Sequence, residues 1–193
     1  MSENTYPQRK LPRLKDFDYA SEGAYFVTIC TQNRLPLFGI IEEDQMHPND
    51  AGKMIQQVWD ALPSKFAELA LDTYVVMPNH FHGIIILVGN AQRGIPPSSK
   101  SNSIPETDDH AGSSLQKINL SDIVHWFKTM TTNAYIRGVK ENNWQRFPKK
   151  LWQHSYYDHI IRNEVDLHHI QNYIINNPTK WAEDSLFIQS PTS

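Results

Sequence analysis

The pattern of apolar and polar residues predicts strands in four parts of the chain. These stretches are rich in β-branched and aromatic side chains and lie at 24–31, 71–77, 81–88 and 152–162. Runs of this length and composition are typical of strands that are buried on at least one face. Pro78-Asn79 separates the second stretch from the third, which is the composition expected of a turn between two strands.

Three other segments repeat apolar residues every three or four positions, which is the period of a helix with one buried face. They begin at Asn49 or Asp50, at Ser121 and at Asp166, and the last one ends before Pro178. The resulting order is strand, helix, strand, strand, helix, strand, helix, without a repeating βαβ unit. We therefore predict an α+β fold with a ferredoxin-like or RRM-like antiparallel sheet and helices packed on one face.

Composition separates one folded domain from three polar segments. The periodic segments lie within 24–182, which we expect to form a single domain, preceded by a polar, basic N-terminal arm at 1–23. Gly, Pro, Ser, Asn and Asp dominate 89–116, and we interpret this stretch as a mobile insertion because it is long for a loop in a compact domain. Residues 183–193 are interpreted as a tail.

Charge and cysteine content exclude several classes of protein. The chain has 193 residues, of which 39% are hydrophobic, and a formal net charge of −3, so it is not a strongly basic nucleic-acid coat protein. Its single cysteine, Cys30, excludes an intramolecular disulfide and a cysteine-based zinc site. No apolar run is long enough to span a membrane. We expect a cytoplasmic protein with no membrane partner.

Basic residues gather locally despite this net charge. Between Lys117 and Arg162, eight basic residues stand against three acidic ones, and aromatic residues are interleaved with them. This composition suits a groove for single-stranded nucleic acid, although a solvated basic face over ordinary core aromatics explains it equally well. The candidate DNA-binding residues, which include two from the N-terminal arm, are Arg13, Lys15, Lys128, Lys149, Lys150 and Arg162.

Two short patterns indicate chemistry. In His80-Phe81-His82, side chains at i and i+2 of a strand share one face, so both imidazoles could bind one cation while Phe81 enters the core. Tyr173 and Asn177 lie at i and i+4 of the last helix and therefore share a face. A tyrosine can act as a nucleophile if a nearby cation stabilises its phenolate. A hydrogen-bonded histidine pair and a packing tyrosine are the alternatives.

Several separated blocks together resemble single-tyrosine HUH transposases, and in particular REP-associated tyrosine transposases. These blocks are 23–31, 75–83, Trp126-Phe127-Lys128, Trp152-Gln153 and the segment from Tyr157 to Pro178. The resemblance extends over residues 11–182 except for the insertion. It implies a DNA transposase-like single-stranded DNA endonuclease and strand transferase that cleaves and rejoins hairpin-associated DNA through a 5′-phosphotyrosine intermediate.

The resemblance also assigns roles to residues. It places the metal ligands at His80, His82 and Asn177 and the nucleophile at Tyr173, whereas Tyr157 becomes a packing or DNA-stacking residue. The implied cofactor is a divalent metal, Mg or Mn, although two imidazoles also accept Zn. The implied partner is single-stranded or hairpin DNA, bound by a monomer or a homodimer.

Two other functions remain open from the sequence. The first is a non-catalytic, domesticated DNA-hairpin-binding protein that recognises the repeat without cutting it. The second is a small metal hydrolase that uses His80 and His82 together with a carboxylate, for which the sequence offers no evident Asp or Glu near the motif.

Overall fold

The computed structural model describes residues 22–88 and 118–187. Its elements are β1 (Gly23–Cys30), η1 (Gln32–Arg34), β2 (Gly39–Glu42), β3 (Gln45–Pro48), α1 (Asp50–Asp60), α2 (Leu62–Lys65), β4 (Leu69–Met77), β5 (His80–Leu87), α3 (Leu120–Glu141), β6 (Tyr157–Ile161), α4 (Glu164–Ile175) and η3 (Trp181–Glu183). Arg13, Lys15 and the insertion predicted at 89–116 lie outside the described residues.

Four strands form one antiparallel sheet in the order β4-β5-β1-β6, while β2 and β3 form a separate hairpin. Because α1 lies between β1 and β4 and α3 lies between β5 and β6, the core arrangement is βαββαβ, which is ferredoxin-like. The predicted α+β class is confirmed. Of the stretch predicted as extended at 152–162, only β6 is a strand, and Trp152 forms an isolated bridge with Thr31.

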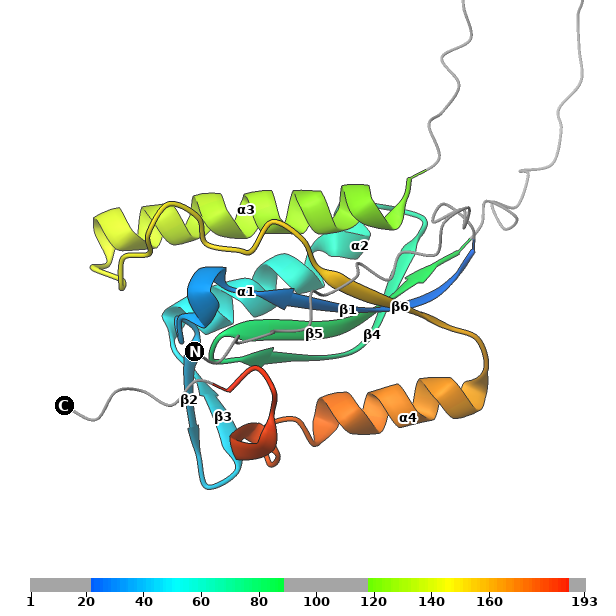
Figure 1. Cartoon of the computed structure of the whole chain (residues 1–193). Helices are drawn as coiled ribbons and strands as arrows, with labels where there is room; N and C mark the ends of the chain where they lie inside the picture. Colours follow the sequence, from blue (N-terminus) through cyan, green and yellow to red (C-terminus); the bar gives the residue numbers. More distant parts are fainter. Residues whose placement is uncertain (1–21, 89–117, 188–193) are drawn as a thin grey trace, which may run out of the picture.

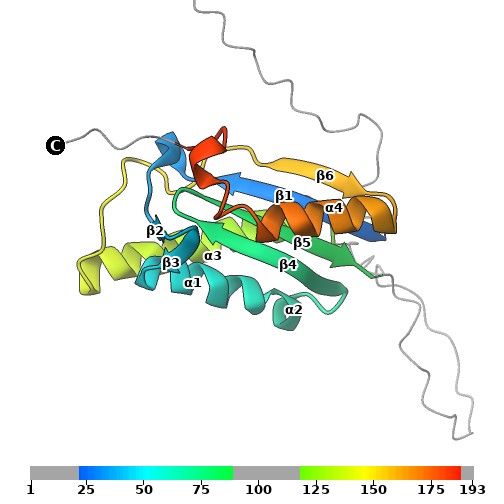
Figure 2. The ribbon, with the colours of Figure 1, turned by 90° about the horizontal axis from the view of Figure 1, so that it is seen from below.

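The helices lie on both faces of the sheet (Figures 1 and 2). α1 and α3 cover one face, as predicted, but α4 packs on the other. The reason is that α4 follows the edge strand β6 and returns across the face that α1 and α3 leave open. There Ile174 packs against Phe26, Ile84 and Ile161. We call these the α1/α3 face and the α4 face.

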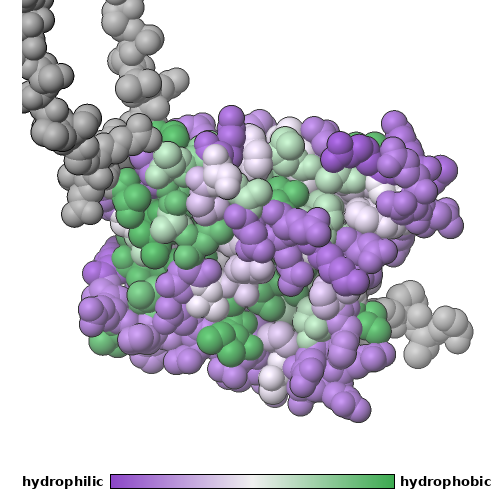
Figure 3. All heavy atoms as spheres, turned by 180° about the vertical axis from the view of Figure 1, so that it is seen from behind, coloured by the Kyte–Doolittle hydropathy of each residue, from purple (hydrophilic) through white to green (hydrophobic). Residues whose placement is uncertain are grey.

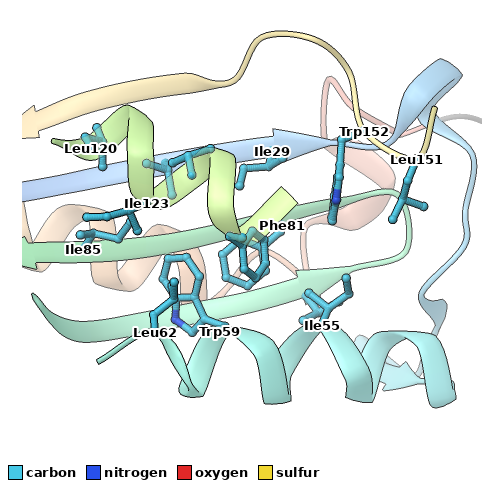
Figure 4. Packing of buried hydrophobic residues seen from close by; sticks show 14 of the residues in the cluster. Ile29, Ile55, Trp59, Leu62, Phe81, Ile85, Leu120, Ile123, Leu151 and Trp152 are labelled. Carbon is cyan, nitrogen blue, oxygen red and sulfur yellow. The ribbon is translucent and has the colours of Figure 1, made fainter. Parts of the chain in front are cut away.

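The α1/α3 face holds the larger apolar core (Figure 4). Trp59, Phe81 and Phe127 meet there with ring centroids 4.5 to 5.4 Å apart, and Trp152 extends the aromatic cluster. Gly83 is required for this packing, because a Cβ at that position would lie 2.5 Å from the Trp59 indole. Close packing of large aromatic rings therefore fixes α1 and α3 on the sheet.

Polar side chains set the starts of the two long helices on this face. Asn49 caps α1, as predicted, by accepting a hydrogen bond from the Gly52 N–H at 2.9 Å. The predicted cap of α3 at Ser121 is wrong by two residues. Asn119 is the cap, and it exchanges hydrogen bonds with Asp122 in a capping box, because this pair satisfies two backbone N–H groups at once.

The molecular surface is mixed in character. Figure 3 shows polar side chains over most of the face seen from behind, and apolar side chains gathered on the left, where β5 ends. Among the helices in residues 22–88 and 118–187, none has the length and apolarity needed to cross a bilayer.

Candidate active site

His80 and His82 lie at the start of β5 and project onto the α4 face. Their ring centroids are 4.5 Å apart, and the two side chains are 0% and 1% exposed. Phe81, between them, belongs to the core of the α1/α3 face. The alternation expected from the spacing of these three residues is therefore present.

Each imidazole is oriented through its Nδ1 atom. Asn79 donates through Nδ2 to the Leu186 carbonyl, so its Oδ1 accepts from the His80 Nδ1–H at 2.8 Å. Thr28 Oγ1 lies 2.8 Å from Nδ1 of His82. Hydrogen bonds of this kind hold metal-binding histidines in one tautomer. In His80, the bond to Asn79 leaves Nε2 as the acceptor nitrogen.

Burial keeps both imidazoles neutral at neutral pH. It lowers the pKa of His80 to about 4, although the Asp184 carboxylate acts in the opposite direction. Burial also lowers the pKa of His82 well below 6.5, and the neighbouring His80 adds to this shift. Neutral imidazole is the form that binds a transition metal.

Two oxygen-bearing side chains lie beside the histidines. A carboxylate oxygen of Asp184 and one ring nitrogen of each histidine all lie within 4.8 Å of one another. Asn177, just after α4, is buried and donates through Nδ2 to Asp184 Oδ2 at 3.2 Å.

The donor atoms of this group fit a divalent cation. Nε2 of His80 and Oδ1 of Asn177 are both buried and have no hydrogen-bond partner. A buried polar atom without a partner costs free energy, and a cation would satisfy both atoms. Two imidazoles with an amide or carboxylate oxygen form a mixed nitrogen and oxygen ligand set that suits such an ion.

Asp184 is the site residue that sequence reasoning missed. It follows Pro178, where the last predicted helix has ended, and lies in the predicted tail at 183–193. No spacing rule connects it with His80. The turn after α4 and the short helix η3 bring it back to the sheet. Leu186 is buried as well, so the packed domain continues beyond 182.

Tyr173 contacts the histidine pair from α4. Its hydroxyl oxygen lies 3.4 Å from Nε2 of His82, within hydrogen-bond distance, and its ring meets the edge of Phe26 at a centroid distance of 6.0 Å. Tyr157, on β6, packs against Phe26 at 6.4 Å. The two tyrosines are similarly exposed, at 47% and 46%, but Tyr173 is the one bonded to a histidine.

The Tyr173 hydroxyl is protonated at neutral pH. Burial raises the pKa of this phenol, and the negative charge of Asp184 raises it further. A cation bound next to the phenol would oppose both effects, because positive charge favours the phenolate.

A cleft of about 290 Å³ opens beside Tyr173. Its lining comes from the end of α4 and the turn that follows, and consists of Tyr173, Asn176, Asn177, Lys180, Glu183, Asp184 and Ser185. The candidate nucleophile and two candidate metal ligands therefore face a space that a substrate can enter.

Four of the six predicted DNA-binding residues are described. Lys149, Lys150 and Arg162 are exposed. Lys128 is not, since its Nζ donates to the carbonyls of Gln153 and His154 at 2.7 and 2.9 Å and burial lowers its pKa to about 8. Its ammonium group holds the 153–154 segment, and its contact with DNA stays a prediction.

Comparison with known proteins shows a shared fold. A solved structure of a REP-associated tyrosine transposase bound to a REP hairpin shares the fold, with a TM-score of 0.53 and 21% identity over 88% of this chain and 74% of that chain. The predicted resemblance to these transposases is confirmed at the level of the fold.

A sequence relative defines the family. An uncharacterized protein of Haemophilus influenzae is 36% identical over 182 residues, which cover 93% of each chain, and the present chain belongs to the same family as that protein. No model of a known protein family matches the chain.

Proposed function

We propose that the protein is a metal-dependent single-stranded DNA endonuclease and strand transferase that uses a tyrosine nucleophile. The observation that carries this proposal is the contact between Tyr173 and His82 beside buried ligand atoms without partners. A nucleophilic hydroxyl next to a cation site is the arrangement that attack on a phosphodiester requires. The REP hairpin bound by the transposase of the same fold supports hairpin DNA as the substrate.

The residues divide the chemistry between them. His80, His82 and Asn177 would hold Mg or Mn, and Asp184 would supply a further oxygen ligand. When bound, the cation would polarise the scissile phosphate and offset its negative charge.

In the proposed reaction, Tyr173 Oη forms a bond to phosphorus while the bond from phosphorus to the 3′ oxygen breaks. The phenol proton passes to water, and the departing 3′ oxygen takes up a proton. The products are a 5′-phosphotyrosine and a 3′-hydroxyl. The phosphodiester energy is retained, so attack by a 3′-hydroxyl on the phosphotyrosine rejoins DNA without ATP.

A matched pair of tyrosine variants tests the nucleophile. Tyr173→Phe keeps the ring that packs on Phe26 and removes only the hydroxyl, so it should abolish the covalent protein–DNA adduct while keeping hairpin binding. Tyr157→Phe removes the hydroxyl of a similarly exposed tyrosine and should keep the adduct. The readout is a denaturing gel of a labelled hairpin with single-stranded flanks, incubated with Mn²⁺. An adduct that survives only in Tyr173→Phe would refute the assignment.

Asp184 makes a metal-dependent hydrolase the second candidate, because it supplies the carboxylate that the histidine pair needs for that chemistry. Such an enzyme would cleave DNA without an adduct and would tolerate Tyr173→Phe. A non-catalytic hairpin-binding protein would show binding with neither adduct nor cleavage. The same gel separates the three functions.

A further inference from the structure

The cleft beside Tyr173 carries charges of both signs at its rim. Lys180 lies in the turn after α4, where its N–H donates to the Asn176 carbonyl, and its own carbonyl accepts from the Glu183 N–H. The Lys180 and Glu183 side chains are exposed. In the part of the chain that the structure describes, the Lys180 ammonium group forms no ion pair, so it is available to a ligand.

The net charge of the cleft depends on a cation. Lys180 and Arg34, whose guanidinium donates to the carbonyl of the lining residue Ser185 at 2.9 Å, balance the carboxylates of Glu183 and Asp184. The buried ligand atoms of His80 and Asn177 point independently to a bound divalent ion. With that ion, the net charge becomes +2. A phosphodiester, which carries one negative charge, would gain no net attraction in the first state and would be attracted in the second.

We propose that this cleft is a phosphate subsite gated by metal binding. Lys180 contacts a phosphodiester of the single-stranded DNA flank, and the carboxylates of Glu183 and Asp184 offset the positive charge of Lys180 and Arg34 until a divalent cation is bound. The identity of the ligand as DNA rests on the proposed function, but the affinity for the single-stranded flank can be measured without cleavage.

The experiment uses the full chain with Tyr173→Phe, so that no adduct forms. Fluorescence anisotropy measures the affinity for two labelled probes, a hairpin with single-stranded flanks and the same hairpin without them, each with and without Mn²⁺. Mn²⁺ should tighten binding of the flanked hairpin about tenfold, which corresponds to one charge-assisted contact. Mn²⁺ should leave the affinity for the hairpin without flanks unchanged. Dividing one affinity by the other cancels the general screening effect of the ion, because both probes experience it.

Two variants in this background test the charges separately. Lys180→Ala should lose about fivefold to tenfold of the affinity for the flanked hairpin in Mn²⁺ and should lower its salt slope by about 0.7. Glu183→Gln should raise the affinity without Mn²⁺ about threefold, because it removes one repelling charge. The matched controls are Lys65→Ala and Glu141→Gln, two exposed residues at the ends of α2 and α3, which should change neither quantity.

The inference is overturned if Mn²⁺ leaves the affinity ratio unchanged, or if Lys180→Ala behaves as Lys65→Ala does. Its failure is distinguishable from failure of the proposed function. An adduct in the protein with Tyr173 intact, together with metal-independent flank binding, would refute the subsite alone. Metal-gated flank binding without any adduct would support the subsite and refute the nuclease.

Discussion

The two faces of the sheet are built on different principles, although they share the same strands. On the α1/α3 face, large aromatic rings such as Trp59 and Phe81 pack in contact. On the α4 face, a small apolar group around Ile174 lies next to buried histidines and an amide. One face therefore supplies stability and leaves the other free to bury polar groups that a ligand can satisfy.

Replacing neighbouring residues of β5 should separate these two roles most strongly. Phe81→Ala opens a cavity among aromatic rings and should lower the free energy of unfolding by about 3–5 kcal/mol. His82→Ala should cost less than about 2 kcal/mol, because burial of its imidazole is itself unfavourable, but should abolish metal binding. Denaturant unfolding measures the first quantity and calorimetric Mn²⁺ titration the second. Equal losses of stability would contradict the division between the faces.

The α4 face should also respond to pH, in a direction set by His80. Its pKa is about 4 in the folded protein against 6.5 for an ordinary histidine, so the unfolded chain binds a proton first as pH falls. Stability from this group is fully present above pH 6.5 and should decrease by about 3 kcal/mol between pH 6.5 and pH 4.

Denaturant unfolding across this pH range, in metal-free buffer, measures the effect. His80→Ala should make the curve less steep, and the slope that remains comes from His82, whose pKa is also lowered well below 6.5. The carboxyls of Asp72 and Asp166 have pKa values lowered from 3.8, so their contribution to stability is lost at lower pH and does not overlap. A wild-type curve as flat as that of His80→Ala would contradict the assigned cause.

A smaller effect should come from adding one methyl group to the α1/α3 face. Gly83→Ala would place a Cβ 2.5 Å from Trp59 and 2.8 Å from Phe81, so the rings must move. We expect a loss of about 1–3 kcal/mol in the free energy of unfolding, with metal binding retained. A cost below about 0.5 kcal/mol, as for an ordinary surface substitution, would show that this packing is loose.

What the sequence predicts well is what depends on spacing within one element. The opposite directions of His82 and Phe81 follow from strand alternation. Tyr173 and Asn177 line one cleft as their i, i+4 spacing predicts, although α4 ends at Ile175 and Asn177 lies in the turn that follows. The contribution of Asp184 could not be predicted in this way, because a turn and a short helix after α4 place it by tertiary packing.

Two other features also depend on tertiary packing. The side of the sheet on which α4 lies depends on where the chain leaves the edge strand β6, and apolar periodicity carries no information about that choice. The burial of Lys128 depends on the path of the 153–154 backbone, which accepts its hydrogen bonds. A basic residue in a basic segment looks the same in sequence whether its ammonium group faces solvent or a carbonyl.

The pairing of β5 sets a limit on changes of chain length. His82 stands opposite Thr28 and Phe81 opposite Ile29, with β4 paired on the other edge of the strand. Because side chains alternate with a period of two, a substitution alters one face at a time, whereas inserting or deleting one residue exchanges the two faces. Such a change before Gly83 would turn both imidazoles toward the aromatic core and Phe81 toward Tyr173. This strand can therefore vary in residue type far more readily than in length.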